Sequence, residues 1–357
     1  MEIGSIFEIN PEDLFSSNNR DIEFPFMEKK EWNMQFFNTG RSAIESFLNV
    51  NAEIQRVWCP SFICSSVIDA IIRAEKEIKY YPIDRELHIN IEFLHQIDFR
   101  KGDALYLVQY FGVSEPLDTI KIIEEFRSKG VLIFEDITMS LLSDKDSCFA
   151  YGDVVIGSIR KWCGIPDGAF IASGKYLPMI EKDKTAYDYT LYYFTAQILK
   201  SLYLSNPEKY DKEEFLSFSE LGIKSLFSDY TVREMSEMSY KLLRTINWGG
   251  CCLRRHKNYE LLYSLLQEIP EIKTLENCNS KVLPLGMFIL TEDRDGLLNH
   301  LISKDVYCNV HWRQNVATEQ FSDSAYLSRH CLTIPCDHRY EEKHMRYIYN
   351  AVKEYYM

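Results

Sequence analysis

A strand–helix–strand pattern in the first half of the chain constrains its fold more than any other feature. The apolar run at residues 104–110 is typical of a buried strand in a parallel sheet. Asp118 can cap a helix over residues 119–129, and Gly130 can close it. Residues 131–134 form the next predicted strand. A strand, a helix and a strand in this order predict an α/β fold with a mainly parallel sheet.

Ionisable residues end one strand of this predicted sheet and follow another. Glu135 and Asp136 end one strand, and Lys161 follows a second, over residues 153–157. Ligands of α/β proteins bind at the carboxyl ends of parallel strands. Pyridoxal phosphate chemistry needs this pair: the lysine forms a Schiff base with the cofactor, and the acid holds the pyridine nitrogen protonated. We therefore predict Lys161 and Asp136 as catalytic. The alternatives are a surface lysine and an aspartate that starts a turn.

A third element lies near the start of a predicted helix. Thr39 or Asn38 can cap this helix, and its first free amides can bind an anion. Those amides belong to Gly40, Arg41 and Ser42. Ser158, three residues before the lysine, could donate its hydroxyl to a phosphate on the same side. A capped helix without any ligand is the alternative interpretation.

Taken in this order, the elements resemble the DegT/DnrJ/StrS aminotransferases, a family of fold type I pyridoxal-phosphate enzymes best known for sugar aminotransferases. The resemblance runs over most of residues 36–355. It rests on motifs at residues 39–44, 58–62, 109–112, 134–136, 161–168, 306–312 and 332–335. It implies a large domain, with a mainly parallel central sheet flanked by helices, and a smaller C-terminal α+β domain.

We predict three regions from these patterns. Residues 1–35 form an N-terminal arm, and residues 36–250 form the large cofactor-binding domain with a helical insertion. Residues 251–357 form the small α+β domain, with a strand over residues 283–290 and a final helix over residues 341–356.

The resemblance also implies an activity. An amino group passes from an amino acid, glutamate by resemblance, to a keto acceptor such as a keto sugar nucleotide, with pyridoxal 5'-phosphate as cofactor. A homodimer with a shared active site is implied as well. Two departures leave other functions open: Met139 replaces a usual His or Gln, and Cys64 stands where an aromatic ring stacks on the cofactor. A lyase-like pyridoxal-phosphate enzyme and a non-catalytic binding protein are the alternatives.

The predicted site combines these inferences. Its cofactor-binding residues are Thr39, Gly40, Arg41, Ser42, Cys64, Asp136, Met139, Ser158 and Lys161. The substrate-binding candidates are Tyr110, His311, Trp312 and Arg313. A donor carboxylate could pair with Arg160, Arg313 or Arg329, and surface pairing is the alternative for each. The aromatic-rich residues 187–194 fit either a subunit interface or a core helix.

Composition restricts the partners. The net charge of −13 argues against binding to nucleic acid or to an anionic membrane. We find no signal-peptide pattern and no apolar run long enough to span a bilayer. Ten cysteines are scattered without paired CxxC motifs, so we expect no metal site. These features predict a cytoplasmic protein with reduced thiols.

Overall fold

The computed structural model describes residues 2–15, 33–143, 152–174, 177–185, 187–275 and 282–357. Residues 1 and 16–32, about half of the predicted arm, lie outside the described residues, as do Cys148 and Cys278. Within the described ranges, no helix is both long and apolar enough to cross a membrane.

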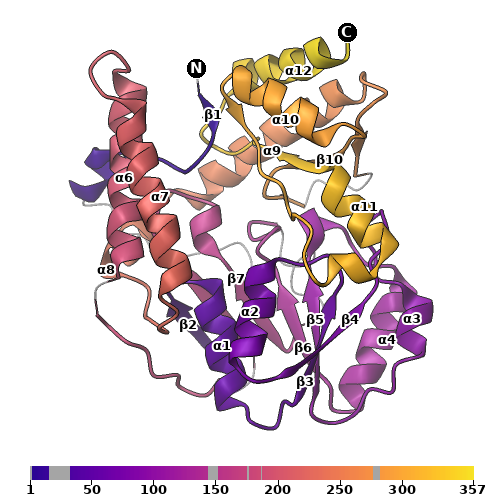
Figure 1. The fold of residues 1–357 in the computed structure, drawn as a ribbon. Helices are drawn as coiled ribbons and strands as arrows, with labels where there is room; N and C mark the ends of the chain where they lie inside the picture. The colour runs from indigo at the N-terminus through magenta and orange to yellow at the C-terminus, as the bar shows by residue number, and fades with distance from the viewer. Residues whose placement is uncertain (1, 16–32, 144–151, 175–176, 186, 276–281) are drawn as a thin grey trace.

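A seven-stranded sheet forms the centre of the larger part of the chain (Figure 1). Its strand order is β2-β8-β7-β6-β5-β3-β4, and only β8 runs antiparallel to its neighbours. The strands are β2 (Asn33–Phe37), β3 (Arg56–Pro60), β4 (Glu77–Tyr81), β5 (Asp103–Val108), β6 (Leu132–Asp136), β7 (Val154–Gly157) and β8 (Ala169–Ser173). The predicted mainly parallel α/β sheet is confirmed.

Helices cover both faces of this sheet. α1 (Gly40–Val50) and α2 (Ser65–Arg73) pack on one face, where Tyr106 and Phe134 join their apolar side chains. α3 (Ile91–His95) and α4 (Leu117–Ser128) cover the other face together with Leu105 and Ile133. Side chains alternate between the faces along each strand. Asp136 therefore lies on the α1 and α2 side, and Glu135 on the opposite side.

Two predicted boundaries near α4 are wrong. Pro116, not Asp118, is the N-cap of α4; Asp118 lies in the first turn and pairs with Lys121 at 2.8 Å. Strand β5 ends at Val108, because residues Tyr110–Gly112 turn into a 3₁₀ helix in which Phe111 has a φ of 49°. Gly130, with a φ of 84°, follows α4 as predicted.

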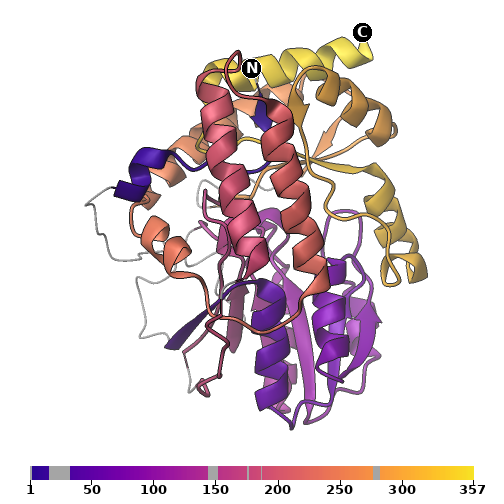
Figure 2. The ribbon, with the colours of Figure 1, turned by 60° about the vertical axis from the view of Figure 1, so that its left-hand side comes forward.

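A helical hairpin extends beyond the sheet. α6 (Asp188–Ser205) and α7 (Lys212–Ser228) lie side by side, and the shorter α8 (Glu237–Leu243) follows (Figures 1 and 2). Tyr187 and Tyr189 are buried against Leu226 of α7, as the core interpretation of residues 187–194 requires. Leu191 of the same segment is 62% exposed.

The C-terminal part is a smaller layer of helices around a short antiparallel sheet. Its strands are β9 (Lys273–Thr274), β10 (Met287–Leu290) and β12 (Cys331–Ile334). Its helices are α9 (Trp248–Leu266), α10 (Arg294–Ser303), α11 (Ser322–His330) and α12 (Glu342–Tyr356). The predicted final helix thus begins beside its N-cap Glu341. The boundary that we predicted after residue 250 falls inside α9, and the one after residue 35 falls inside β2.

The predicted strand of this part is shorter than expected, and the motif at residues 306–312 is a strand only at its start. β10 omits residues 283–286, because the amides of Leu283 and Leu285 donate to Ser143 Oγ and to the Met139 carbonyl instead of to a strand. β11 (Val306–Tyr307) covers only the start of residues 306–312 and pairs in parallel with β1 (Ile3–Gly4). The N-terminal residues therefore pack on the C-terminal part of the same chain.

Gly157, at the end of β7, offers a test of the packing around the central sheet. A Cβ atom added there would lie 2.5 Å from Cε1 of Phe170 and 3.1 Å from Cδ1 of Leu141. Both neighbours are fully buried, so neither can move away freely. We expect Gly157→Ala to lower the free energy of unfolding by about 1–3 kcal/mol in urea denaturation. At Gly174 no atom of the described residues, apart from its chain neighbours, lies within 4 Å of an added Cβ, so Gly174→Ala should change this free energy by less than about 0.5 kcal/mol. Equal effects of both substitutions would contradict this packing.

Candidate functional site

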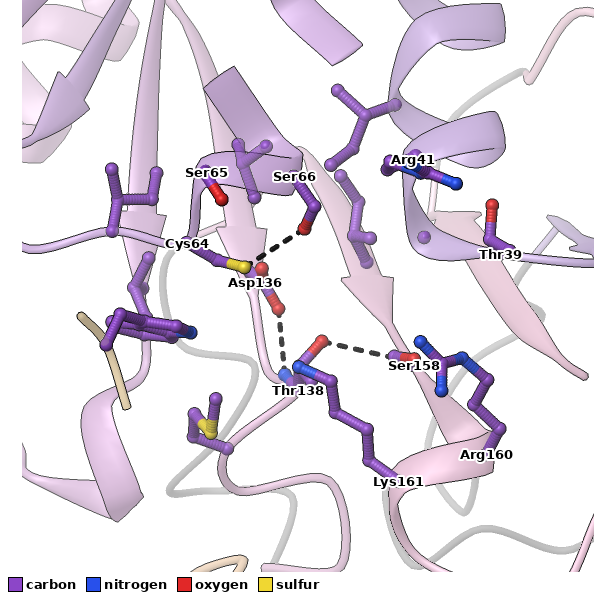
Figure 3. A pocket seen from close by; sticks show the side chains of 18 of the residues that line it. Thr39, Arg41, Cys64, Ser65, Ser66, Asp136, Thr138, Ser158, Arg160 and Lys161 are labelled. Carbon is purple, nitrogen blue, oxygen red and sulfur yellow. Dashed lines mark hydrogen bonds between the residues drawn. The ribbon is translucent and has the colours of Figure 1, made fainter. Parts of the chain in front are cut away.

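One cavity at the carboxyl ends of the central strands collects most of the predicted site residues (Figure 3). It is lined by Thr39, Gly40, Arg41, Cys64, Asp136, Met139, Ser158, Lys161 and Trp312. They come from segments that lie far apart in the sequence and meet because parallel strands end at the same edge. Ser42, Tyr110, His311 and Arg313 do not line it.

The Asp136 carboxylate is held by two donors. The Tyr106 hydroxyl donates to Oδ2 at 2.8 Å, and the Thr138 amide donates to Oδ1 at 2.8 Å. Burial, followed by the charge of Asp136, raises the pKa of Tyr106 well above its ordinary value, so this phenol remains a donor. The neighbouring Glu135 lies on the other face, where it accepts from Gln109 at 2.7 Å. Only Asp136 of the acidic pair is therefore available to the cavity.

Thr138 connects the segment of the acid to the segment of the lysine. Besides its amide bond to Asp136, its hydroxyl accepts from the Ser158 amide at 3.1 Å. Its carbonyl accepts from the indole of Trp162 at 2.8 Å. Figure 3 shows its side chain between Asp136 and Lys161. Three hydrogen bonds at one residue thus fix the ends of β6 and β7 relative to each other.

Lys161 closes a 3₁₀ turn, Ile159–Lys161, directly after β7. Its amine points into the cavity toward Thr138 and Asp136 (Figure 3). Burial lowers the pKa of this amine below its ordinary value. The Arg160 guanidinium lowers this pKa further, while Cys64 and Asp136 oppose the shift. The neutral, nucleophilic form is therefore favoured by the surroundings.

Gly168 joins the lysine turn to the segment before α1. Its carbonyl accepts from the amides of Ile159 and Arg160 at 3.0 and 3.2 Å, and its amide donates to the Asn38 carbonyl at 2.9 Å. Its φ of 137° lies in a region that favours glycine, and an added Cβ would lie 2.9 Å from Met235 Sδ. This explains why a glycine stands at the end of the predicted motif at residues 161–168.

The start of α1 forms another wall of the cavity. Thr39 is the N-cap, and its hydroxyl accepts from the Ser42 amide at 3.2 Å. The Ser42 amide is therefore already used by the cap, and the prediction that it is free for an anion is wrong. Gly40 and Arg41 remain at the cavity. The Nη1 atom of Arg41 is buried and has no hydrogen-bond partner among the described residues.

The substrate-binding candidates have different surroundings. Trp312 lines the cavity and meets the Phe62 ring at 5.2 Å. The Tyr110 hydroxyl donates to the Phe62 carbonyl, so it is not offered to a ligand. His311 is hydrogen-bonded to Thr333 Oγ1 at 3.0 Å, and burial, assisted by the Lys161 charge, lowers its pKa to about 3. Arg313 is exposed outside the cavity.

Several lining residues escaped the sequence analysis. They are Thr138, Ser65, Ser66, Arg160 as a wall residue, and Phe227. Thr138 follows the predicted acid by two residues, a spacing that could have marked it as a turn residue. Ser66 contacts Cys64 Sγ at 3.1 Å from the first turn of α2. Phe227 comes from the end of α7, and no local pattern places that helix beside the sheet.

These residues fit pyridoxal phosphate. The site provides a fixed carboxylate for the pyridine nitrogen, an amine for the aldehyde and the N-terminus of an eleven-residue helix for the phosphate. The unpartnered Nη1 atom of Arg41 supplies a positive charge at the helix end. Within the described ranges, no group of side chains could hold a metal ion.

The lowered pKa of Lys161 can be measured in the cofactor-free protein. Reductive methylation by formaldehyde requires the neutral amine, so its rate rises as the amine loses its proton. We expect half-maximal modification of Lys161 at a lower pH in the folded protein than in the urea-unfolded chain, where the ordinary value of 10.5 applies. Peptide mass spectrometry gives the rate at this position. A midpoint at the same or a higher pH in the folded protein would contradict the buried placement of the amine.

No sequence model of a protein family and no curated protein sequence matches the chain. Solved structures match nearly all of it. The apo form of the putative sugar aminotransferase Spr1654 from Streptococcus pneumoniae has a TM-score of 0.70 at 14% identity, covering 99% of this chain and 98% of that chain. Helicobacter pylori PseC, an aminotransferase involved in the biosynthesis of pseudoaminic acid, has a TM-score of 0.66 at 11% identity, with 99% of each chain covered.

A third match is a DegT DnrJ EryC1 StrS aminotransferase from Brucella abortus, with a TM-score of 0.62 at 15% identity over 90% of this chain and 86% of that chain. At such identities the similarity concerns the fold. The chain therefore has the fold type I architecture of the DegT/DnrJ/EryC1/StrS aminotransferases, as the sequence resemblance predicted.

Proposed function

We propose that this protein is a pyridoxal-phosphate-dependent aminotransferase. It would move an amino group from an amino acid, glutamate by resemblance, to a keto acceptor such as a keto sugar nucleotide. The observation that carries the proposal is the arrangement of one cavity: the Asp136 carboxylate, the Lys161 amine and the start of α1 all face it. The names of the solved structures with this fold support the same reaction class.

The residues of the cavity have distinct roles in this proposal. When bound, the cofactor supplies an electron sink for the carbanion at the substrate Cα. Asp136, fixed by Tyr106 and Thr138, holds a proton on the pyridine nitrogen. Lys161 would accept the proton that leaves the donor Cα and later release it, as general base and then general acid. A neutral amine is needed for this task, and burial favours that form.

The two alternatives differ from this proposal in what they require. A lyase-like enzyme would use the same lysine and acid but would not leave the cofactor in its amino form. A non-catalytic protein would need neither group, yet both are held in the cavity. Met139 and Cys64, the departures that raised these alternatives, both line the cavity.

Incubation with glutamate alone tests the reaction class. We expect the purified, cofactor-loaded protein to lose its visible absorbance at about 420 nm as the cofactor takes its amino form, and to release 2-oxoglutarate. Lys161→Ala should slow this conversion by at least about a hundredfold, because the proton carrier is lost. It should also abolish the adduct trapped by borohydride. An adduct that maps to another lysine would overturn the assignment.

Asp136→Asn is the matched variant at the other end of the cofactor. It keeps the size of the side chain and the hydrogen bond from Thr138, so the cofactor should still bind. Proton removal from glutamate should slow strongly, because an amide cannot hold the pyridine nitrogen protonated. A wild-type protein that binds the cofactor but whose visible absorbance glutamate leaves unchanged would favour the lyase-like alternative.

A homodimer in the cytoplasm completes the proposal. The α6–α7 hairpin exposes apolar side chains over much of its length: Leu191, Leu204, Leu216, Leu221, Ile223 and Phe227. Phe227 also lines the cavity, so a partner that covered this hairpin would border the site. The eight cysteines that the structure describes are free thiols, which supports a reducing compartment.

Sedimentation at low micromolar concentration tests the assembly. We expect a species of twice the chain mass, because burying this apolar face is favourable. Leu191→Glu combined with Ile223→Glu should shift the species to the monomer and weaken cofactor binding. Leu117→Glu, a change at an exposed apolar residue of α4, serves as the matched control. A wild-type monomer with full turnover would refute the shared site.

A further inference from the structure

Arg160 precedes the proposed catalytic lysine and places its guanidinium at the wall of the cavity. Its Nε atom is buried and has no hydrogen-bond partner among the described residues. The Tyr189 ring lies 5.7 Å from the guanidinium carbon and provides only a weak cation–π contact. The residue as a whole is half-buried, so the unmet need concerns one buried donor of this cation, and a bound anion would supply its acceptor.

The nearby acid Asp167 does not meet this need. Its carboxylate accepts hydrogen bonds from the hydroxyls of Ser236, Ser239 and Thr190 and from the Ser236 amide. These donors come from the segments around α6 and α8. Asp167 thus acts on Arg160 only through its charge at longer range.

The position of the guanidinium indicates which end of a ligand it meets. In Figure 3 the Arg160 side chain lies beside Ser158, while the Lys161 amine points away from it toward Thr138 and Asp136. Thr39 and Arg41 face the same part of the cavity as Ser158. Arg160 therefore belongs to the end of the cavity opposite the acid.

Arg41 strengthens this assignment from an independent element. Its side chain is only 9% exposed, and its Nη1 atom has no partner among the described residues. Nη2 donates to the Leu226 carbonyl, and the guanidinium stacks on the rings of Phe227 and Tyr230 at 5.4 and 4.6 Å. These contacts fix Arg41 in place while one donor remains open. Each of the two guanidinium groups, one on α1 and one on the lysine turn, thus has a buried donor without an acceptor among the described residues, and together they predict a doubly charged anion.

We propose that Arg160 is a ligand of the cofactor phosphate, which it shares with Arg41 and the start of α1, and is not a ligand of the donor carboxylate. This inference rests on the proposed function, since it identifies the anion as the phosphate of pyridoxal phosphate. The sequence predicted backbone amides and hydroxyls as ligands of the phosphate. The inference adds a charged ligand, which lies next to the lysine in the chain.

Titration calorimetry on the cofactor-free protein tests the proposal. The probes are inorganic phosphate, pyridoxal phosphate, and pyridoxal, which lacks the phosphate. Arg160→Gln should weaken both phosphate-containing probes by about 10- to 100-fold and leave the affinity for pyridoxal within about threefold. Arg160→Lys should fall between, because it keeps the charge but loses the planar fork. Arg346→Gln, which removes an exposed arginine of α12, controls for net charge and should match the wild type.

Thermal unfolding gives a second readout. Without ligand, Arg160→Gln removes a half-buried charge whose Nε has no acceptor among the described residues, so its Tm should equal or exceed that of the wild type. Inorganic phosphate should raise the Tm of the wild type clearly and that of the variant little. The stabilisation of a folded protein by a ligand grows with the ratio of ligand concentration to Kd, and the variant should have the higher Kd. A lowered Tm in the absence of ligand, with an unchanged response to phosphate, would overturn the proposal in favour of a structural role.

Two other outcomes are decisive. An unchanged phosphate affinity with a raised KM for glutamate would assign Arg160 to the donor carboxylate and overturn the proposal. The second outcome is that the wild type binds inorganic phosphate, Arg160→Gln does not, and the wild type fails to bind pyridoxal phosphate. This result would overturn the proposed function and the identity of the ligand. In that case the phosphate titration would still establish Arg160 as an anion ligand.

Discussion

The hydrogen bonds of Thr138 are the constraint on which the site depends. Its amide orients the Asp136 carboxylate, its hydroxyl receives the Ser158 amide, and its carbonyl receives the Trp162 indole. Since Lys161 lies between the last two residues, the distance between acid and amine is set by these bonds and not by a flexible loop. The backbone of Gly168 also fixes the lysine turn, because its hydrogen bonds link this turn to Asn38 before α1. Three parts of one site are thereby held as a single unit before any ligand binds, as pre-organisation for catalysis requires.

The sequence carried enough information for the sheet and for the two central residues. Buried parallel strands are continuous apolar runs, and an ionisable residue directly after such a run is conspicuous. The positions of Asp136 and Lys161 in the cavity follow from that pattern together with the rule that parallel strands end at one edge. The contact partners did not follow from it. The Tyr110 hydroxyl satisfies a backbone carbonyl after a turn that no periodicity encodes. The use of the Ser42 amide, in contrast, follows from the predicted Thr39 cap, because an N-cap side chain accepts from the amide two or three residues on.

One buried arginine of the C-terminal part contacts and stabilises the segment that contains Lys161. Arg255 of α9 stacks on the Trp162 ring at 4.6 Å and donates to the Trp162 carbonyl at 3.0 Å. Its Nε donates to His338 Nδ1 at 3.2 Å, and burial lowers the pKa of His338 to about 4, so the imidazole stays a neutral acceptor. The smaller C-terminal layer is thus in direct contact with the residue next to the lysine. This coupling was not visible in the sequence, where Arg255 lies in a basic run that reads as a solvated helix face.

The charges of the cavity differ in sign from those of the whole molecule. The chain carries a net charge of −13, yet the cavity gathers Arg41, Arg160 and Lys161 against the single carboxylate of Asp136. A positive cleft with low-dielectric walls concentrates the local field, whereas the acidic exterior repels anions elsewhere on the surface. The phosphate of the proposed cofactor and the carboxylate of an amino-acid donor are both anions that such a field would draw inward. Burial lowers the pKa of the Lys161 amine, whereas the guanidinium groups of the two arginines stay charged because they do not lose their proton. The amine is then free to react while the positive charge that retains the ligand stays in place.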